Sequence, residues 1–199
     1  MEKDLLIPLR LRVWFRKLLE PLARALGASG VSPSTLTVLG LIPAVAAGVA
    51  FARGEVRLGG ALMIVSGLFD LSDGLLARLG NKETKFGALL DSTIDRYAEL
   101  AAFAGLAVLF RGEVALYGVL AALAGSMMVS YVKARAEGLG FPCQGGMLQR
   151  PERFVILILG ALIGVTVLKW AIWLIAVLAN ITALERLVRT GSLMRKQGQ

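Results

Sequence analysis

Long apolar stretches separated by short polar segments dominate this chain and predict membrane-spanning helices. The first stretch begins near Ser34 and runs without a charged residue to Ala52. A helix needs about 20 apolar residues to cross the ~30 Å hydrocarbon core of a bilayer. Further stretches follow at residues 57–78, 86–110, 114–132, 154–168 and 170–184. The sequence therefore predicts an all-α integral membrane protein with six transmembrane helices.

The boundary between the last two stretches is the least clear, because only Lys169 separates them. A single helix over residues 154–184 would be about 46 Å long at 1.5 Å per residue. That length exceeds the ~30 Å core of a bilayer. We therefore predict a break at Lys169, although no glycine or proline marks a turn there.

The N-terminal segment has a different pattern, in which large apolar residues alternate with arginine and lysine. Within residues 5–26, Trp14, Phe15 and Leu18 recur at helical spacing beside basic residues. This pattern is typical of an amphipathic juxtamembrane helix that lies on the membrane surface. The predicted organisation is an interfacial helix over residues 1–30, a six-helix domain over 31–190 and a cytoplasmic tail over 191–199.

Composition agrees with a membrane protein and narrows the chemistry. Of the residues, 56% are hydrophobic and 18% are charged, whereas soluble domains average about 25% charged. The chain has no histidine and a single cysteine, Cys143, which excludes imidazole bases, histidine metal ligands and an internal disulfide. Any bound metal must use oxygen ligands, which favours Mg²⁺, Mn²⁺ or Ca²⁺. The net charge of +8 indicates an anionic partner, either the membrane surface or the substrate.

Basic residues are distributed unequally between the two predicted sides of the membrane. With six spans, the N-terminal arm, residues 78–85, residues 133–153 and the segment after Leu184 lie on one side and hold 17 of the 22 Lys and Arg residues. The loops on the other side hold 4. Basic loops stay on the cytoplasmic side, so both termini are predicted to face the cytoplasm from a multi-pass position in the inner (plasma) membrane.

Four aspartates lie where hydrocarbon is expected. Asp70 and Asp73 fall in the second apolar stretch, and Asp91 and Asp95 fall in the third. A charged residue at the centre of a span costs about 2.5–3.5 kcal/mol on insertion scales, so these side chains must face a polar interior. Residues three or four apart share one face of a helix. The short connection over residues 79–85 predicts adjacent antiparallel helices whose four carboxylates converge in the cytoplasmic half.

Converging carboxylates need cations, because like charges oppose one another's ionisation. Arg78 and Arg96 supply two positive charges nearby. Divalent cations would supply the rest, and carboxylate oxygens suit Mg²⁺ or Mn²⁺. A proton or cation transporter remains the alternative at this point, since transport pathways also carry intramembrane acids.

The spacing of these residues forms a recognisable motif, D-x2-D-G-x2-A-R-x8-G-x3-D-x3-D, from Asp70 to Asp95. It resembles, without a gap or substitution, the signature of the CDP-alcohol phosphatidyltransferases. Members of that family transfer a phosphatidyl group from a CDP-linked lipid to an alcohol and release CMP. Residues 130–137 and 150–153 are similar to one branch, the phosphatidylinositol phosphate synthases, which includes archaetidylinositol phosphate synthases.

The resemblance implies a role for each matched residue. Asp70, Asp73 and Asp91 would hold one Mg²⁺, and Asp70, Asp91 and Asp95 would hold a second, with Mn²⁺ as a possible substitute. Asp95 would also accept the proton of the acceptor hydroxyl. The resemblance assigns CDP-lipid contacts to Ser32, Pro33, Ser34, Thr35, Gly74, Ala77, Arg78, Thr84 and Gly87. It assigns binding of the acceptor phosphate to Lys133, Arg135, Arg153 and Arg186, although Arg135 would equally fit an ordinary basic helix end.

The resemblance thus predicts a Mg²⁺-dependent enzyme of phospholipid biosynthesis whose active site faces the cytoplasm. It would join CDP-diacylglycerol or CDP-archaeol to inositol 1-phosphate (1D-myo-inositol 3-phosphate), giving phosphatidylinositol phosphate and CMP. Glycerol 3-phosphate, serine or a second phospholipid remain alternative acceptors. The implied partners are membrane lipid and a second copy in a homodimer, and no nucleic acid is predicted as a partner.

Overall fold

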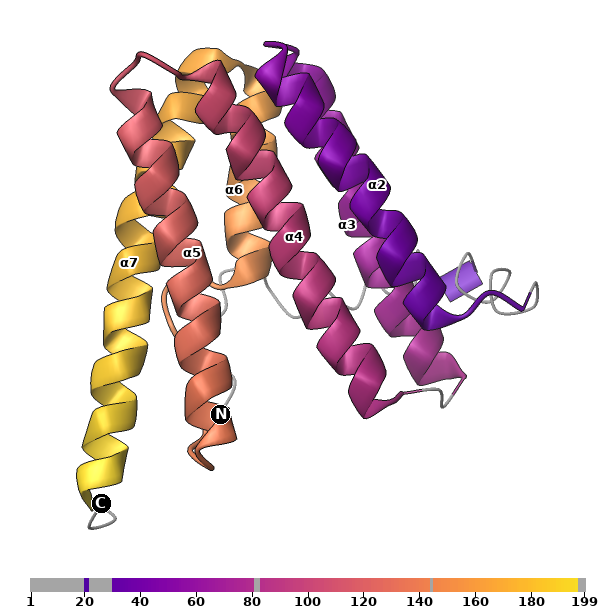
Figure 1. Cartoon of the computed structure of the whole chain (residues 1–199), viewed down its shortest axis with the longest axis vertical. Coiled ribbons are helices and arrows are strands. Elements are labelled where there is room, and N and C mark those ends of the chain that lie inside the picture. The colour runs from indigo at the N-terminus through magenta and orange to yellow at the C-terminus, as the bar shows by residue number, and fades with distance from the viewer. Residues whose placement is uncertain (1–19, 22–29, 81–82, 144, 197–199) are drawn as a thin grey trace. The chain divides into compact units, whose positions relative to one another are not determined.

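The computed structural model describes residues 20–21, 30–80, 83–143 and 145–196. Within these residues the secondary structure is entirely helical, with six long helices labelled α2 to α7 and no strand (Figure 1). The predicted all-α class is therefore confirmed for the described part of the chain. The predicted amphipathic helix over residues 5–26 falls almost wholly outside it.

The helices form two compact units. The N-terminal unit contains α2 (Pro33–Ala52), α3 (Val56–Leu79) and α4 (Lys85–Leu109). The C-terminal unit contains α5 (Ala115–Gly138), α6 (Arg150–Ile163) and α7 (Val165–Lys196).

The prediction of six transmembrane helices is wrong in number. Among the residues that the structure describes, four helices are long and apolar enough to cross a membrane, namely α2, α3, α5 and α7. Helix α6 has 14 residues, or about 21 Å, which is short of the ~30 Å core. Helix α4 has 25 residues but carries four charged residues near its middle, namely Asp91, Asp95, Arg96 and Glu99. The apolar stretches therefore predicted the positions of the helices, but they did not predict which helices are long and apolar enough to cross a membrane.

The predicted break at Lys169 is also wrong, because the chain turns at Gly164, between α6 and α7. Gly164 has φ of 148°, a backbone conformation that glycine adopts without the steric cost of a side chain. Lys169 instead lies inside α7, where its Nζ pairs with the Glu113 carboxylate and lies 5.4 Å from the centre of the Phe110 ring. The sequence did contain a turn signal, five residues before the predicted position.

In the N-terminal unit, α3 and α4 each pack mainly along α2 rather than against each other. Small residues make this packing close: a Cβ on Gly105 of α4 would overlap the backbone of Gly48 on α2. On the other side of α2, the Ser66 hydroxyl of α3 donates to the Gly40 carbonyl oxygen at 2.9 Å. Glycines that let helix backbones approach are typical of helix packing in membranes.

In the C-terminal unit, α7 packs along α5 and also contacts α6. The Asn180 amide of α7 donates to the Ala121 carbonyl oxygen of α5 at 3.0 Å. Gly125 of α5 faces Asn180 so closely that a Cβ there would lie 2.6 Å from the amide nitrogen. A polar contact and a small residue therefore hold α5 and α7 together.

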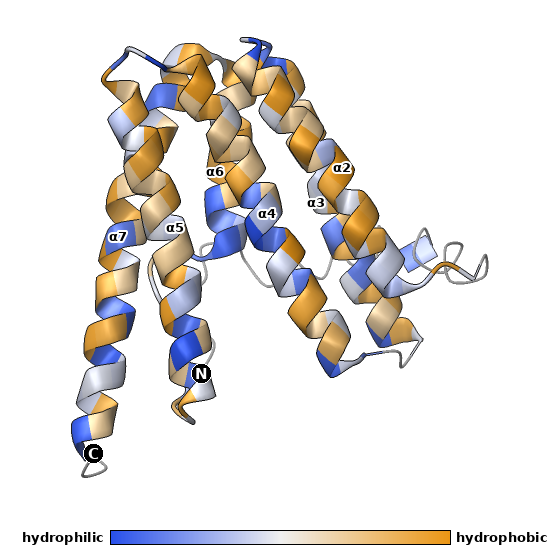
Figure 2. Cartoon of the chain, viewed as in Figure 1, coloured by the Kyte–Doolittle hydropathy of each residue, from blue (hydrophilic) through white to orange (hydrophobic). Residues whose placement is uncertain are grey.

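Many large apolar residues are exposed in both units, and hydrophobic residues are frequent along the helices of both (Figure 2). Ile42 on α2 is 64% exposed, and Leu184 on α7 is 62% exposed. Soluble monomers rarely expose apolar surface on this scale. The surface is therefore suited to lipid, in agreement with the four candidate spans.

Candidate active site

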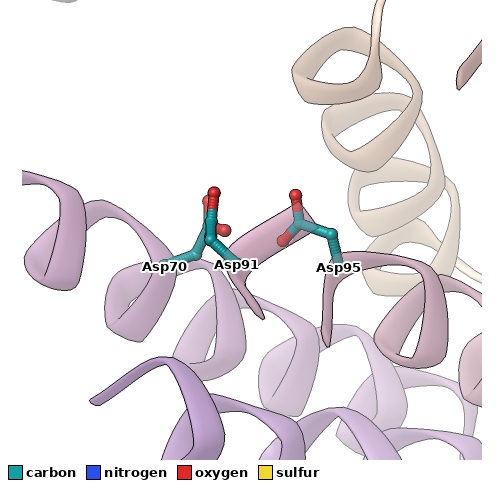
Figure 3. A group of neighbouring side chains, drawn as sticks. All are labelled: Asp70, Asp91 and Asp95. Carbon is teal, nitrogen blue, oxygen red and sulfur yellow. The ribbon is translucent and has the colours of Figure 1, made fainter. Parts of the chain in front are cut away.

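Three of the four predicted aspartates come together in the N-terminal unit. Asp70 comes from α3, and Asp91 and Asp95 come from α4 (Figure 3). One carboxylate oxygen from each lies within 4.8 Å of the others, and all three residues are partly buried. Figure 3 shows the three carboxylates directed to the same side of the helices. This separation is short enough for a single cation to contact all three.

The helix geometry explains why these side chains meet. Asp91 and Asp95 lie one helical turn apart and share a face of α4. Because α3 and α4 both pack along α2, the last turns of α3 lie near the first turns of α4. Asp70 lies nine residues before the end of α3 at Leu79, and Asp91 follows the start of α4 by six residues. The predicted convergence arises through α2 as a shared support.

Asp73, the fourth aspartate, is buried on α3 with 4% of its surface exposed. Its carboxylate interacts with Thr37 of α2 and electrostatically with Asp70 and Asp91. Its Oδ2 atom has no hydrogen-bond partner among the described residues. Buried acceptors without partners are rare in native structures, and one explanation for them is an ion. The unpartnered oxygen and the all-oxygen ligand set fit a hard divalent cation such as Mg²⁺ or Mn²⁺.

Asp73→Asn is expected to stabilise the metal-free protein and to weaken its stabilisation by Mg²⁺. The amide keeps the shape of the side chain and removes a buried charge, whose unpartnered oxygen costs on the order of 1–3 kcal/mol. Thermal unfolding in detergent, with EDTA and then with Mg²⁺, measures both effects. Glu55→Gln is the matched control, because Glu55 is exposed and its side chain makes no capping hydrogen bond. An equal Mg²⁺ shift in Asp73→Asn and the unaltered protein would contradict the metal assignment.

The residues predicted to contact the nucleotide include the N-terminus of α2. Ser32 caps this helix by accepting a hydrogen bond from the Thr35 backbone N–H at 3.1 Å. The hydroxyls of Ser32 and Thr35 also lie 2.8 Å apart, and Pro33 occupies the first turn. Ser32 and Thr35 are exposed. This end of α2 therefore places the exposed hydroxyls of Ser32 and Thr35 at a helix N-terminus, an end that favours anions.

Other predicted nucleotide contacts lie at the facing ends of α3 and α4. The Thr84 hydroxyl accepts a hydrogen bond from the Gly87 N–H at 2.9 Å, which caps α4. A Cβ on Gly74 would lie 3.3 Å from the Arg78 guanidinium, so this glycine leaves room for the arginine side chain. Arg78 is exposed and Ala77 is partly buried. Thr84 and Gly74 thus each have a structural role in addition to the predicted contact.

Two further polar residues near the aspartates were not predicted from the sequence. Glu99 follows Asp95 by one helical turn, and it is buried with 9% exposure. The continued four-residue spacing after Asp91 and Asp95 is the signal that could have identified it. Thr37 is also buried, at 8% exposure, beside Asp73. A threonine one turn into an apolar helix gave a weaker signal.

The four residues predicted to bind the acceptor phosphate all lie in the C-terminal unit, and their environments differ. Lys133 is exposed and pairs with Glu137 at 3.8 Å, and Arg135 is also exposed. Arg153 is buried at 2% exposure and donates to the Leu148 carbonyl oxygen at 3.4 Å. Arg186 is buried at 6% exposure and donates to backbone carbonyl oxygens. The two buried arginines thus already hold the backbone, whereas the two exposed residues do not.

The observed features define a class of protein: a helical membrane protein that holds a carboxylate cluster suited to divalent cations. The family follows from comparison with known sequences. A model of the CDP-alcohol phosphatidyltransferase family matches residues 30–184, and the chain belongs to this family. The resemblance of the aspartate motif is therefore confirmed, and the chain is an enzyme of the phosphatidyltransferase class rather than a transporter.

Individual relatives point to one branch of the family. The chain is 39% identical to the phosphatidylinositol phosphate synthase of Mycobacteroides abscessus, over 90% of this chain and 87% of the relative. It is 35% identical to the archaetidylinositol phosphate synthase of Methanothermobacter thermautotrophicus, over 87% of this chain and 88% of the relative.

Solved structures agree with this placement. The structure of the Mycobacterium tuberculosis phosphatidylinositol phosphate synthase with CDP-DAG bound superposes with a TM-score of 0.81 at 35% identity, covering 87% of this chain and 94% of that one. The same enzyme in complex with manganese and citrate gives a TM-score of 0.79 at 35% identity, covering 85% and 87%.

Proposed function

We propose that this enzyme transfers a phosphatidyl group from CDP-diacylglycerol, or an archaetidyl group from CDP-archaeol, to an inositol phosphate. The products would be phosphatidylinositol phosphate, or its archaeal ether-lipid counterpart, and CMP. The observation that carries the proposal is the convergence of Asp70, Asp91 and Asp95 within the family motif. The names of the relatives support inositol phosphate as the acceptor.

The aspartates would hold two divalent cations, with Asp70, Asp73 and Asp91 at one and Asp70, Asp91 and Asp95 at the other. Such cations neutralise the charge of the donor pyrophosphate and polarise its phosphorus–oxygen bonds. The exposed end of α2 at Ser32–Thr35 and the Arg78 guanidinium would orient the nucleotide. These groups would hold the donor in place for attack by the incoming hydroxyl.

Asp95 is the proposed general base. The chain has no histidine to compete for this role, and the Asp95 carboxylate would take the proton of the acceptor hydroxyl. Arg96 lies beside Asp95, with its Nη1 at 3.5 Å from Oδ2, and this contact would help to orient the carboxylate. The acceptor oxygen then forms a bond to phosphorus, the bond from phosphorus to CMP breaks, and the proton passes to Asp95.

The acceptor phosphate would be recognised by basic residues of the C-terminal unit. Lys133 and Arg135 are exposed on the last turns of α5, and Arg153 and Arg186 are buried nearby in that unit. Several Lys and Arg groups around one phosphate give charge-assisted hydrogen bonds. These four residues support a phosphorylated alcohol over serine as the acceptor.

The proposal includes the setting of the enzyme. Hydrophilic residues lie toward the C-terminal ends of α5 and α7 (Figure 2), and the last turns of these helices include Arg135, Arg195 and Lys196. These basic residues support a cytoplasmic position for that end. We place both termini and the active site on the cytoplasmic side of the inner (plasma) membrane. A homodimer is proposed from the family resemblance.

A panel of acceptors tests the proposed function. The purified full-length protein in lipid vesicles, with CDP-diacylglycerol and Mg²⁺, is expected to release CMP with inositol 1-phosphate as the preferred acceptor. Omitting the acceptor or adding EDTA should abolish release. Faster turnover with glycerol 3-phosphate, serine or unphosphorylated inositol would refute the acceptor assignment while preserving the reaction class.

A further inference from the structure

Thr37 lies on the face of α2 that packs against α3, where it contacts the candidate metal ligand Asp73. The two helices lie side by side and run in opposite directions (Figure 1). One turn further along α2, the Gly40 carbonyl oxygen accepts a hydrogen bond from Ser66, and a Cβ on Gly40 would lie 2.9 Å from the Phe69 Cβ. Phe69 in turn lies one turn before Asp73 in α3. The close packing at Gly40 therefore fixes which residue of α3 faces Thr37.

The two oxygens of the Asp73 carboxylate have different surroundings. Within the described residues, Oδ2 has no hydrogen-bond partner. The hydrogen-bonding contacts of the carboxylate are with the Thr37 side chain and the Gly74 backbone. Gly74 is the next residue in the chain and moves together with Asp73, so Thr37 supplies a contact to a different helix. Thr37 thus restrains the rotation of the carboxylate, while Oδ2 stays available to a ligand.

The Thr37 hydroxyl has one proton and two acceptors within reach. One acceptor is the Pro33 carbonyl oxygen, at 3.1 Å, and the other is Asp73. In α2 the Pro33 carbonyl is also the helix partner of the Thr37 backbone N–H, four residues later, so it does not depend on the hydroxyl. An ionised carboxylate is the stronger acceptor of the two. The hydroxyl proton is therefore used best in a hydrogen bond to Asp73.

We propose that Thr37 is a positioning residue, which orients the Asp73 carboxylate for binding of a divalent cation. This inference rests on the metal site of the proposed function. Thr37 is 8% exposed and Asp73 is 4% exposed, so bulk water does not compete for their contact. Thr37 lies outside the aspartate motif and outside the predicted nucleotide contacts at residues 32–35. Loss of a group that hydrogen-bonds a metal ligand typically lowers metal affinity by about 10–100-fold.

Titration of the purified full-length protein with Mn²⁺, followed by the electron paramagnetic resonance signal of the free ion, measures metal affinity without turnover. Thr37→Val removes the hydroxyl and is expected to raise the Kd for Mn²⁺ by about tenfold or more. Thr37→Ser keeps a hydroxyl and should restore an affinity close to that of the unaltered protein. In CMP-release assays, Thr37→Val should need more Mg²⁺ for half-maximal turnover and approach the normal kcat at saturating Mg²⁺.

Thr93→Val is the matched control for loss of a threonine hydroxyl in a helix. The Thr93 hydroxyl donates to the Leu89 carbonyl oxygen one turn earlier, at 2.8 Å, which is the kind of bond that Thr37 can make within α2. Thr93 is exposed and lies two residues from both Asp91 and Asp95, so it does not share their face of α4. This variant should leave the Kd for Mn²⁺ unchanged.

A second substitution at Asp73 separates positioning from a general effect on helix packing. In Asp73→Asn there is no carboxylate for the hydroxyl to orient. Adding Thr37→Val to Asp73→Asn should therefore raise the Kd for Mn²⁺ much less than Thr37→Val does alone, which is the non-additivity expected of residues in contact. A packing defect between α2 and α3 would instead lower the affinity by the same factor in both backgrounds.

Two results would overturn this inference and leave the proposed function intact. One is an unchanged Kd for Mn²⁺ in Thr37→Val when the unaltered protein binds the ion. The other is an equal loss of affinity with Asp73 present or replaced, because the effect of Thr37 would then not pass through that carboxylate. A lack of Mn²⁺ binding by the unaltered protein would refute the metal site of the proposed function, and this inference with it.

Discussion

Replacing Asp95 by asparagine is expected to lower kcat by about 10³-fold or more, because general-base catalysis alone contributes roughly 10²–10⁴-fold. The amide accepts no proton at neutral pH, and the chain has no histidine to replace it. The variant also removes one of the three carboxylates that lie within 4.8 Å of one another. Release of CMP from CDP-diacylglycerol, measured with saturating acceptor, gives kcat directly.

Binding of the CDP-lipid should remain measurable in Asp95→Asn, because Asp70, Asp73 and Asp91 still offer carboxylates. This difference separates a catalytic defect from a failure to fold or to bind the donor. Glu55→Gln also replaces a carboxylate by an amide. Glu55 lies at the N-terminal end of α3, whereas Asp70 and Asp73 lie toward its C-terminal end, so this variant is expected to keep full turnover. Unaltered turnover in Asp95→Asn would refute the assignment of Asp95 as the base.

The site could be predicted from sequence to the extent that helix periodicity determines it. The four-residue spacing of Asp91 and Asp95 places both on one face, whatever the surrounding fold. Their meeting with Asp70 depends instead on how α3 and α4 pack, and the route is indirect: each helix packs mainly on α2. The unpartnered oxygen of buried Asp73 is a tertiary feature that no local pattern reveals.

The errors in the predicted spans have a similar cause. Hydropathy marks which residues are apolar, but it does not say where a helix begins or ends. Gly164 breaks the last apolar region because its backbone adopts a φ of 148°, whereas Lys169 continues α7 and pairs with Glu113. In this region the backbone freedom of glycine mattered more than the charge of lysine.

For basic residues near helix ends, the sequence does not predict which side chains are exposed and which are buried. Lys133 and Arg186 both precede the cytoplasmic ends predicted for their helices, and both match the family pattern. One is exposed on α5 and the other is buried at 6% exposure, holding two carbonyl oxygens. The pattern treats these two residues alike, but their burial differs, and burial depends on contacts distant in sequence.

Gly105→Ala is expected to destabilise the N-terminal unit and to reduce turnover with it. A Cβ at Gly105 would overlap the Gly48 backbone, so α4 must move away from α2. Overpacking of this kind costs about 1–3 kcal/mol, which exceeds the roughly 0.5–1 kcal/mol that alanine gains over glycine within a helix. Movement of α4 also displaces Asp91 and Asp95 relative to Asp70, and a 1 Å misplacement can cost about 10²-fold in rate.

Gly191→Ala provides the opposite case with the same chemical change. Gly191 lies within α7, and a Cβ there would meet no atom within 4 Å, so the helix preference of alanine should leave Tm unchanged or raise it. Thermal unfolding in detergent and CMP release in vesicles measure the two variants side by side. A Tm for Gly105→Ala equal to that for Gly191→Ala would contradict the close approach of α2 and α4. If Tm falls while turnover stays normal, this contact supports the fold without setting the geometry of the aspartates.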